Sequence, residues 1–472
     1  MDRGIFRQYD IRGTVPDTFN KEIAAKIGNA IGIKAIKKFS KNHPSISVGR
    51  DVRLSSDEIF EGLIAGLTDS GCKVINLGIV PTPVTYFSSE FLKPDGFIMI
   101  TGSHNPPEYN GLKFGLGNNT IHSEGIIEIY DQITNNDYFM APVRGFIEKY
   151  NIVKDYFEFY ENRFADLKSK IEKIKKIKVV IDSGNGVASK IAPIIFRSLG
   201  VDVVELFCEP DGRFPNHHPD PTVEKNLIDA KKSVIENRAD FAVAFDGDAD
   251  RIGVLDEKGD IIWGDILLYI YGKELKKRYE KPTIIADVKA SQVLFDSLEK
   301  IGAKSIMWKT GHSLIKDKLK STKAELAGEM SGHIFFSDGY FGYDDAIYAA
   351  VRFLEVYVNN LIDGAITNTS DLVRELPKVF NTPEIRFECP DDIKFELVEK
   401  FKNIFKNYAS EGKFGIKSII DIDGIRVNFQ NGWGLLRSSN TQPVLVMRFE
   451  ADSQEKMNSY CYLFEEELKK LN

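Results

Sequence analysis

The sequence contains few cysteines and no long apolar stretch. Its four cysteines, Cys72, Cys208, Cys389 and Cys461, lie far apart and form no Cys-x-x-Cys pair, which is typical of a protein in a reducing compartment. No uninterrupted apolar segment reaches the roughly 18 residues of a membrane-spanning helix, and the N-terminus carries charges where a signal peptide has its apolar run. We therefore expect a cytoplasmic protein without a membrane partner.

The sequence also lacks an excess of positive charge. It has 62 Lys and Arg against 69 Asp and Glu, a formal net charge of -7, which offers no basic surface to nucleic acid. A small anion held by a few local donors is compatible with this balance. The 472 residues, of which 43% are hydrophobic, exceed what one core usually supports, so we expect several domains.

A strand-helix-strand pattern appears three times. The first strands end near Asp51, Asp182 and Asp287, in SISVGRD, KVVIDSGNG and TIIADVKAS. Each following helical segment has an apolar residue four positions before a glycine, the usual helix terminator: Leu67 and Gly71, Phe196 and Gly200, Leu298 and Gly302. A second strand candidate follows directly, in CKVINLG, VDVVELF and AKSIMW. The pattern predicts three βαβ units with parallel strands covered by helices.

A later strand in each unit leads into an unusual polar loop. FIMI precedes residues 101–106, FAVAF precedes residues 246–251, and AELA precedes residues 328–333. Ligands collect at the carboxyl ends of strands in open α/β sheets, so these three loops predict one site shared by three domains.

The pattern changes after about residue 370. The segments IDIDGIRVNF and PVLVMRFEA alternate like hairpin strands, and a helix is expected from Ser453. We expect a smaller α+β unit there. The predicted domains are residues 1–148, 149–254, 255–370 and 371–472, which carry in turn the serine loop, the acidic loop, the third polar loop and a C-terminal polar loop.

The segment TGSHNPPEYNGLK offers a candidate nucleophile. Ser103 follows a glycine that permits a sharp turn, and two prolines stiffen the chain beyond it. A serine hydroxyl needs a base, a metal or a charged neighbour, which His104 and Lys113 provide if the loop folds back on itself. An ordinary turn serine is the alternative, and the loop alone does not exclude it.

The segment DGDADR predicts a metal site. Asp246, Asp248 and Asp250 follow an apolar strand at alternate positions and repel one another unless a cation lies between them. Oxygen-only ligands suit magnesium or calcium, and Arg251 is placed to bind a phosphate. A calcium-binding EF-hand would have Glu257 at its twelfth position, but Arg251 occupies the sixth position, where glycine is required. A solvated acidic loop is the other alternative.

The third polar loop, GEMSGH, is a weaker signal. Glu329, Ser331 and His333 stand at alternate positions and would share one side of an extended loop. Glutamate and serine suit sugar hydroxyls, although an ordinary polar turn explains the segment equally well.

The C-terminal polar loop, LLRSSNTQP, combines one guanidinium with hydroxyls and an amide. Its residues are Arg437, Ser438, Ser439, Asn440 and Thr441. Such a set can bind phosphate, with arginine supplying a bidentate charge. A polar hairpin turn is the alternative.

These motifs together resemble the α-D-phosphohexomutases, and among them the phosphomannomutase/phosphoglucomutase group. The resemblance covers nearly the whole chain in order: FRQYDIRG, TGSHNPPEYNGLK, DGDADR, GEMSGH and RSSNTQPVLVMRFEA. It implies three related mixed-sheet α/β domains and a smaller C-terminal α+β lid domain around a central cleft. It also implies an isomerase that interconverts hexose 1-phosphate and hexose 6-phosphate, of mannose, glucose or both.

The resemblance implies a phosphoserine mechanism with Mg2+. Ser103 carries the phosphoryl group, the three aspartates hold Mg2+ with a phosphate oxygen, and Lys113 is a candidate general acid or base. A hexose 1,6-bisphosphate is the intermediate and activator. The implied catalytic and metal-binding residues are Ser103, His104, Lys113, Asp246, Asp248, Asp250 and Arg251. The implied contacts to the phosphosugar are Tyr9, Arg12, Lys289, His312, Glu329, Ser331, His333, Arg437, Ser439, Asn440 and Thr441.

Two details favour the mannose and glucose enzymes. Met330 stands where phosphoglucosamine mutases usually carry glutamine, and the serine loop lacks the alanine common in amino-sugar enzymes. Leu112 and Ser438 depart from the residues most often found in the family, without removing a functional atom. A phosphoglucosamine mutase of the same family is the nearest alternative.

Two other classes remain as alternatives. A haloacid-dehalogenase-like phosphatase would use Asp246 as nucleophile and the pair Asp344 and Asp345 as late acidic residues. A non-catalytic sugar-phosphate-binding protein would bind without isomerisation. Neither explains all four polar loops. We expect a monomer or weak homodimer with a small phosphosugar as its partner.

Overall fold

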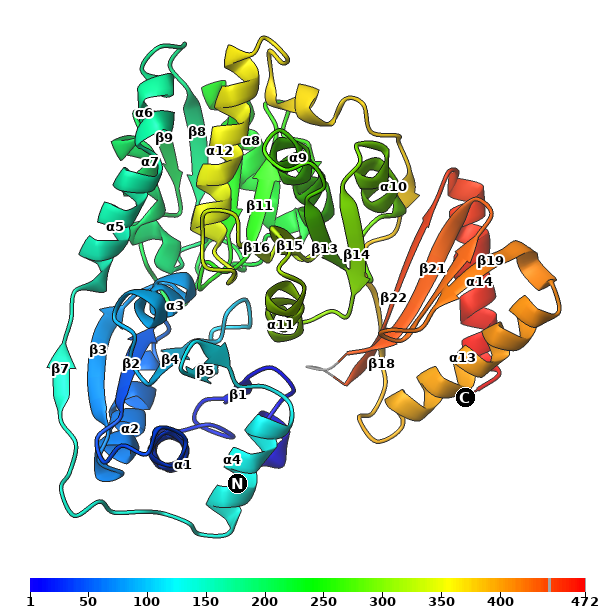
Figure 1. Ribbon diagram of the computed structural model, residues 1–472. Helices are drawn as coiled ribbons and strands as arrows, with labels where there is room; N and C mark the ends of the chain where they lie inside the picture. Colours follow the sequence, from blue (N-terminus) through cyan, green and yellow to red (C-terminus); the bar gives the residue numbers. More distant parts are fainter. Residues whose placement is uncertain (440–442, 472) are drawn as a thin grey trace.

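Four β-sheets follow one another along the chain. The computed structural model describes residues 1–439 and 443–471, and the four sheets contain seven, five, four and six strands in chain order. Figure 1 shows them as four bodies, with the fourth, in orange and red, beside the third. The predicted architecture, three α/β domains and a C-terminal α+β domain, is confirmed.

The first three sheets share one arrangement. In each, the first strand of the unit pairs in parallel with both the second and the third strand. These strands are β2 (Ser45–Arg50), β3 (Lys73–Ile79) and β4 (Gly96–Ile100); β8 (Lys178–Asp182), β9 (Asp202–Leu206) and β10 (Phe241–Phe245); and β13 (Thr283–Asp287), β14 (Lys304–Trp308) and β15 (Leu326–Gly328). An antiparallel fourth strand then follows each polar loop: β5 (Tyr109–Leu116), β11 (Ile252–Leu255) and β16 (Ile334–Phe336). The predicted βαβ units are therefore present in mixed sheets.

The three glycines predicted to end helices do so in the same way. They follow α2 (Ser56–Asp69), α7 (Ala192–Ser198) and α10 (Gln292–Lys300), with φ of +94° at Gly71, +91° at Gly200 and +76° at Gly302. In each case the next N–H donates back to the predicted apolar residue: Cys72 to Leu67, Val201 to Phe196, and Ala303 to Leu298. Only glycine adopts this left-handed backbone without steric cost, so each helix stops where its strand must begin.

Helices cover the sheets and join the second and third domains. The second crossover in each unit is α3 (Thr82–Phe91), α8 (Ile228–Asn237) or α11 (His312–Thr322). The other helices of the first three domains are α1 (Lys21–Phe39), α4 (Glu124–Thr134), α5 (Ile152–Arg163), α6 (Ala165–Ile171), α9 (Gly264–Lys276) and α12 (Ala346–Ile362). Helix α12 is buried along most of its length, and its apolar residues belong to one core cluster with those of α5, β8, β10 and α9. The second and third domains therefore share a core.

The C-terminal domain has a core of its own. Its strands are β17 (Phe380–Asn381), β18 (Ile385–Glu388), β19 (Ile416–Ile420), β20 (Ile425–Phe429), β21 (Gly432–Ser438) and β22 (Val444–Ala451), all paired antiparallel. Figure 1 shows α13 (Lys394–Ser410) and α14 (Gln454–Lys469) against this sheet. As predicted, α14 begins after Ser453, whose side chain accepts from Lys456 N. The short strands elsewhere are β1 (Ile11–Thr14), β6 (Asn119–Thr120), β7 (Ile147–Lys149) and β12 (Ile261–Ile262).

A buried arginine docks the C-terminal domain onto the third domain. The guanidinium of Arg426 donates to Val288 O at 2.9 Å and Ala290 O at 2.7 Å. It also lies 3.9 Å from the ring centroid of Trp433. Because Val288 and Ala290 follow β13, this contact fixes the C-terminal domain near the carboxyl ends of the third sheet.

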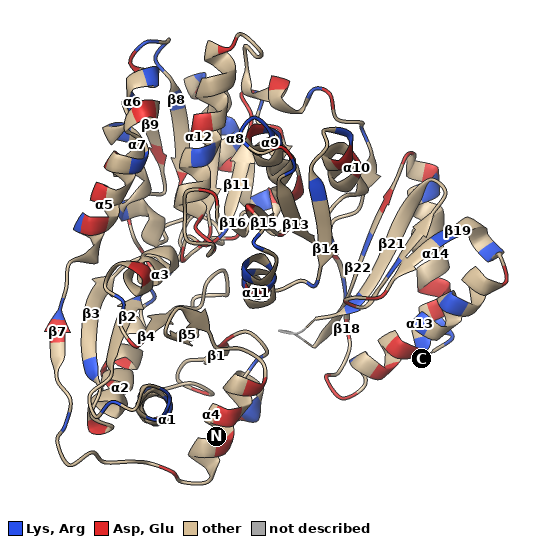
Figure 2. Cartoon of the chain, viewed as in Figure 1, with Lys and Arg blue, Asp and Glu red and all other residues tan. Residues whose placement is uncertain are grey.

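Acidic and basic residues are mixed along the chain. Figure 2 shows acidic and basic residues interspersed on all four domains. Among the described residues, no helix combines the length and apolarity needed to cross a bilayer.

Candidate active site

The three polar loops of the α/β domains touch one another. They lie at the carboxyl ends of β4, β10 and β15, as the sequence predicts. A Cβ on Gly247 would lie 2.6 Å from Ser103 O, so only glycine lets the first two loops approach this closely. Ile252 N donates to Gly332 O at 3.0 Å, which joins the second loop to the third.

Ser103 lies buried at the point where the serine and acidic loops meet. Its exposed fraction is 2%, and its φ of +49° is unusual for a residue other than glycine. The Oγ donates to Asp246 Oδ2 at 2.9 Å and lies 3.2 Å from His104 Nδ1. Burial and nearby cations, Arg251 first, lower the pKa of His104 well below its usual value, so the ring is neutral beside the serine.

An arginine that the sequence analysis missed shapes the serine loop. The guanidinium of Arg53 is buried and donates to four loop carbonyls, those of Ser103, Asn105, Pro106 and Tyr109, at 2.5 to 2.9 Å. Asp51 pairs with Arg53 Nε at 3.2 Å and accepts from Gly102 N at 3.3 Å. These contacts hold the strained backbone around Ser103 in one shape.

An aspartate stands at the end of the first strand in each of the three units, and this repetition was a sequence signal for residues that support the polar loops. Asp51 and Asp287 each follow or end the first strand of their unit, and each accepts from a backbone N–H of the polar loop in its domain, Gly102 N in the case of Asp51. For Asp287 that donor is Met330 N, at 3.1 Å. In the second domain Asp182 accepts instead from Gly184 N at 2.9 Å.

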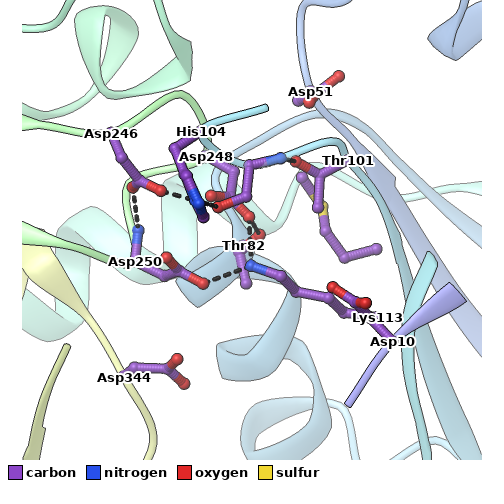
Figure 3. Close-up of polar contacts among 12 residues, drawn as sticks. Asp10, Asp51, Thr82, Thr101, His104, Lys113, Asp246, Asp248, Asp250 and Asp344 are labelled. Carbon is purple, nitrogen blue, oxygen red and sulfur yellow. Dashed lines mark hydrogen bonds and ion pairs between the residues drawn. The ribbon is translucent and has the colours of Figure 1, made fainter. Parts of the chain in front are cut away.

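The acidic triplet converges next to Ser103. Asp246, Asp248 and Asp250 are fully buried, and one oxygen from each lies within 4.8 Å of the other two. Figure 3 shows them around Lys113, whose Nζ lies 2.7 Å from Asp248 Oδ2 and also bonds Asp250 Oδ2. Thr82, a second residue missed from the sequence, donates to Asp248 Oδ2 at 2.5 Å.

The charge balance of this triplet favours a bound cation. One ammonium group faces three buried carboxylates, which leaves negative charge unbalanced. Burial, with Asp250 and Asp248 nearby, raises the pKa of Asp246 well above its usual value. The Oδ1 atoms of Asp248 and Asp250 are buried and accept no hydrogen bond within the described residues. Oxygen ligands of this kind suit a hard divalent ion, so the residues present fit a metal site.

Lys113 is held as a cation in this network. Burial alone would lower its pKa, but Asp248, Asp250 and Asp246 raise it above its usual value. Burial likewise opposes ionisation of Asp248, yet the Lys113 charge and hydrogen bonds from Lys113 and Thr82 hold the pKa of Asp248 below its usual value. The ammonium group therefore partly balances the triplet.

The third polar loop is a tight turn instead of an extended segment. Glu329 N donates to His333 O at 2.9 Å and Gly332 N donates to Glu329 O at 3.0 Å. Glu329 and Ser331 still contact each other, because Ser331 Oγ donates to Glu329 Oε2 at 3.1 Å. His333 turns away from this pair and accepts at Nε2 from Arg251 Nε at 3.0 Å.

Four further predicted residues lie around these loops. Arg12 donates to Asn105 Oδ1 at 2.9 Å, and Tyr9 donates to Thr310 O at 2.8 Å. The ring of His312 lies 6.0 Å from that of Tyr9 and 5.6 Å from that of His333, centroid to centroid. Lys289 is buried and lies farther along the third domain, where its Nζ bonds Glu384 Oε1 at 2.8 Å.

The C-terminal polar loop is linked to the third domain through Asp423, which contacts both Arg437 and Thr310. Arg437 Nε lies 3.1 Å from Asp423 Oδ2, and the same oxygen accepts from Thr310 N at 3.0 Å. Ser439 is buried with an exposed fraction of 7%. Asn440 and Thr441 lie outside the described residues.

A cavity opens between the first, third and fourth domains. Its volume is about 430 Å³, and its lining includes Tyr9, Thr310, Asp423 and Ser438. Among the described residues of the four polar loops, only Ser438 of the C-terminal loop contributes to this lining. The structure thus brings the serine loop, the acidic triplet and His333 into direct contact, whereas Lys289 and Arg437 bond residues of the fourth domain.

Known protein families match this chain along most of its length. Family models described as phosphoglucomutase/phosphomannomutase α/β/α domains I, II and III and C-terminal domain match residues 3–139, 154–259, 263–380 and 384–466. A phosphomannomutase/phosphoglucomutase of Pseudomonas syringae pv. tomato is 43% identical and covers 99% of this chain and 95% of its own length. A phosphoglucomutase of Neisseria gonorrhoeae is 41% identical, over 96% of this chain and 94% of its own.

A solved structure has the same fold. A phosphoglucomutase/phosphomannomutase family protein of Burkholderia thailandensis superposes with a TM-score of 0.87 at 37% identity, covering 99% of this chain and 98% of its own. The four-domain fold and these relatives define a phosphotransferring mutase that acts on a small sugar phosphate. The chain belongs to the phosphoglucomutase/phosphomannomutase family.

Proposed function

We propose that the enzyme interconverts the 1-phosphate and 6-phosphate of mannose and of glucose, with Ser103 as the phosphoryl carrier. The observation that carries this proposal is the hydroxyl of Ser103, 2.9 Å from Asp246 in a buried acidic triplet. The printed names of the relatives support the substrate class. Met330, in place of the glutamine of amino-sugar enzymes, favours mannose and glucose over glucosamine.

The reaction begins with phosphorylated Ser103. A free hydroxyl of the sugar phosphate attacks the phosphorus, the bond from phosphorus to Ser103 Oγ breaks, and a hexose 1,6-bisphosphate forms. One proton leaves the sugar oxygen and one is taken up at Oγ. A single acid-base group can therefore accept the first proton and donate the second. Lys113, held charged by Asp248 and Asp250, is the candidate donor, and neutral His104 lies beside Oγ.

The bisphosphate then turns end for end and returns its other phosphate to Ser103. Because either phosphate must occupy the distal position, the loop of Arg437, Ser439, Asn440 and Thr441 is proposed to bind both. Glu329 and Ser331 are proposed to bind sugar hydroxyls, and Tyr9, Arg12, Lys289, His312 and His333 to complete the contacts. Exclusion of water protects the intermediate, a role suited to the C-terminal domain as a lid.

Asp246, Asp248 and Asp250, with a phosphate oxygen on Ser103, would hold Mg2+. When bound, Mg2+ would supply positive charge that stabilises the phosphoryl group in transit. Arg251 and Lys113 add positive charge from the chain itself.

The remaining expectations belong to the same proposal. They are domain limits at 1–148, 149–254, 255–370 and 371–472, a cytoplasmic location, and a monomer or weak homodimer. We expect no nucleic-acid partner, in keeping with the net charge of -7.

The comparisons do not favour a phosphatase of the haloacid dehalogenase type. Its late acidic pair would need both Asp344 and Asp345 at the site, but Asp345 accepts from Tyr156 at 2.7 Å and also from Tyr340, inside the core. Arg251 and Ser103 would also have no part in such a reaction.

A substrate panel tests the proposal. Turnover is measured with the 1-phosphates of mannose, glucose, glucosamine and N-acetylglucosamine, with Mg2+ and a trace of hexose 1,6-bisphosphate. Mannose and glucose phosphates should be converted at comparable rates and the amino sugars poorly. A preference for amino sugars, or release of inorganic phosphate as the main product, would reject it.

A further inference from the structure

Lys289 and Glu384 form a largely buried ion pair at the junction of the third and fourth domains. Lys289 Nζ bonds Glu384 Oε1 at 2.8 Å, and the exposed fractions of the two side chains are 7% and 19%. Lys289 follows β13, whereas Glu384 directly precedes β18. The proposed function gives Lys289 a contact to the phosphosugar but gives Glu384 no part. Desolvation offsets much of the attraction in a buried ion pair, so stability alone does not account for this one.

Both residues are anchored to the same strand of the fourth sheet. Glu384 lies between β17 and β18, which both pair with β22. Lys289 O accepts from Arg448 Nη1, in β22, at 2.6 Å. The backbone is therefore held at both ends of the ion pair, and a change of partner falls to the long, flexible side chain of Lys289.

A series of polar contacts links Lys289 to Arg437, the arginine of the proposed phosphate loop. Lys289 Nζ lies 3.8 Å from Asp287 Oδ2, which accepts from Thr310 Oγ1 at 3.2 Å. Thr310 N donates at 3.0 Å to Asp423 Oδ2, and the same oxygen lies 3.1 Å from Arg437 Nε. Both cations are therefore connected to Thr310, which lines the cavity of about 430 Å³.

Glu384 keeps its negative charge in this place. Burial raises the pKa of its carboxyl group, but the charges of Lys289 and Arg386 outweigh burial and hold that pKa below its usual value. Arg386 Nη2 donates to Glu384 Oε2 at 3.2 Å. Burial lowers the pKa of Arg437, whereas Asp423 and, to a smaller extent, Glu384 raise it. One carboxylate therefore acts on both cations that are proposed to contact the phosphosugar.

We propose that Glu384 competes with the distal phosphate of the substrate for Lys289 and so limits how tightly the phosphosugar is held. A carboxylate and a phosphate offer an ammonium group the same kind of charged oxygen acceptor, and the two anions repel each other. This inference rests on the proposed function, in which the bisphosphate leaves the distal site and turns before the second transfer. A carboxylate that takes Lys289 back favours that release.

Glu384→Gln removes the competing charge and keeps the shape of the side chain. KM for glucose 1-phosphate should fall about fivefold, because the phosphate no longer displaces a carboxylate. In the same variant kcat should fall about threefold, because the bisphosphate leaves the distal site more slowly. A merely structural role predicts the opposite change in KM, since a loosened Lys289 binds phosphate less well. Glu388→Gln, at an exposed position of β18, is the matched control and should leave both constants within about twofold of the wild type.

Binding without turnover provides a second test. Titration calorimetry of Ser103→Ala with glucose 6-phosphate measures Kd in a variant that lacks the proposed phosphoryl carrier. Adding Glu384→Gln to this variant should lower Kd about fivefold. Adding Lys289→Met instead should raise Kd about tenfold, because a charge-assisted contact to the phosphate is lost.

The outcomes separate this inference from the proposed function. A KM or Kd that rises or stays unchanged in Glu384→Gln would overturn the competition, as would a Kd unaffected by Lys289→Met. A wild-type enzyme that binds glucose 6-phosphate but shows no mutase turnover would instead reject the proposed function. If Glu384→Gln does not fold, Glu384→Asp decides: its carboxylate reaches Lys289 less closely, so Kd should fall about twofold, and an unchanged or higher Kd would overturn the inference.

Discussion

At the scale of single residues, the position of Ser103 depends on Arg53. Four carbonyls of the serine loop converge on one guanidinium, and Asp51 balances its charge. The sequence identified the serine from its own loop but missed this arginine, because Arg53 lies 50 positions earlier and only the fold brings it near. The acidic triplet was predictable because its three members are close in sequence and repel one another.

Arg53→Lys tests this support. Lysine can pair with Asp51 but cannot bond four carbonyls from one planar group, so kcat should fall about tenfold to a hundredfold while KM changes little. Steady-state kinetics on the purified variant measure this. Arg50→Lys is the matched control, because Arg50 lies at the end of β2 and pairs with exposed Asp57. Equal effects of the two changes would show that Arg53 has no special role.

The buried carboxylate of Asp345 should make the stability of the fold depend on pH. Burial raises its pKa to about 6, against about 3.9 for an exposed aspartate. Between about pH 4 and pH 6 the unfolded chain loses this proton while the folded protein keeps it, so stability falls as pH rises, by about 3 kcal/mol in all. Unfolding midpoints of the wild type and Asp345→Asn should therefore diverge across that range. Parallel pH profiles would contradict the assignment.

At the scale of elements, the βαβ units were predictable and the connections between domains were not. Apolar strands and terminating glycines are local signals, so their positions could be found from sequence. The turn of residues 329–333 could not be predicted, because it is formed by the hydrogen bond from Glu329 N to His333 O across the loop. The shared core along α12 likewise depends on packing between distant segments.

Gly200→Ala tests the terminating glycines. An added Cβ at Gly200 meets only Ile171 Cγ2 at 3.6 Å, so the cost is that of the left-handed backbone, about 1–2 kcal/mol. Gly71→Ala should cost more, because its Cβ would lie 3.0 Å from Ala141 Cβ and 3.1 Å from Asn42 O. Denaturant unfolding of both variants gives the order, and an unchanged midpoint for Gly200→Ala would contradict this account of helix termination.

At the scale of the whole molecule, the site depends on how the C-terminal domain is docked. The sequence predicted that four loops share one site but offered no contact between them. In the structure, Arg437, Asp423 and Thr310 join the fourth domain to the third, and Tyr9 joins the first. Arg426, which the sequence analysis did not single out, anchors the same domain to the end of β13.

Arg426→Met should loosen this docking. The change removes the buried hydrogen bonds to Val288 and Ala290, so the segment between the third and fourth domains, residues 374–379, should be cut by protease about tenfold faster. KM for the phosphosugar should rise as well, since the proposed distal phosphate loop belongs to this domain. Lys406→Met, which breaks an exposed pair with Asp421, is the control. Identical cutting rates for both variants would argue against Arg426 as the anchor.

The most direct test is to locate the phosphoryl group on the protein. The enzyme is incubated with isotopically labelled hexose 1,6-bisphosphate and Mg2+, and the labelled peptide is identified by mass spectrometry. The account predicts label on Ser103, none in Ser103→Ala, and loss of mutase turnover in that variant. Label on an aspartate of the acidic triplet, or substantial turnover by Ser103→Ala, would contradict it.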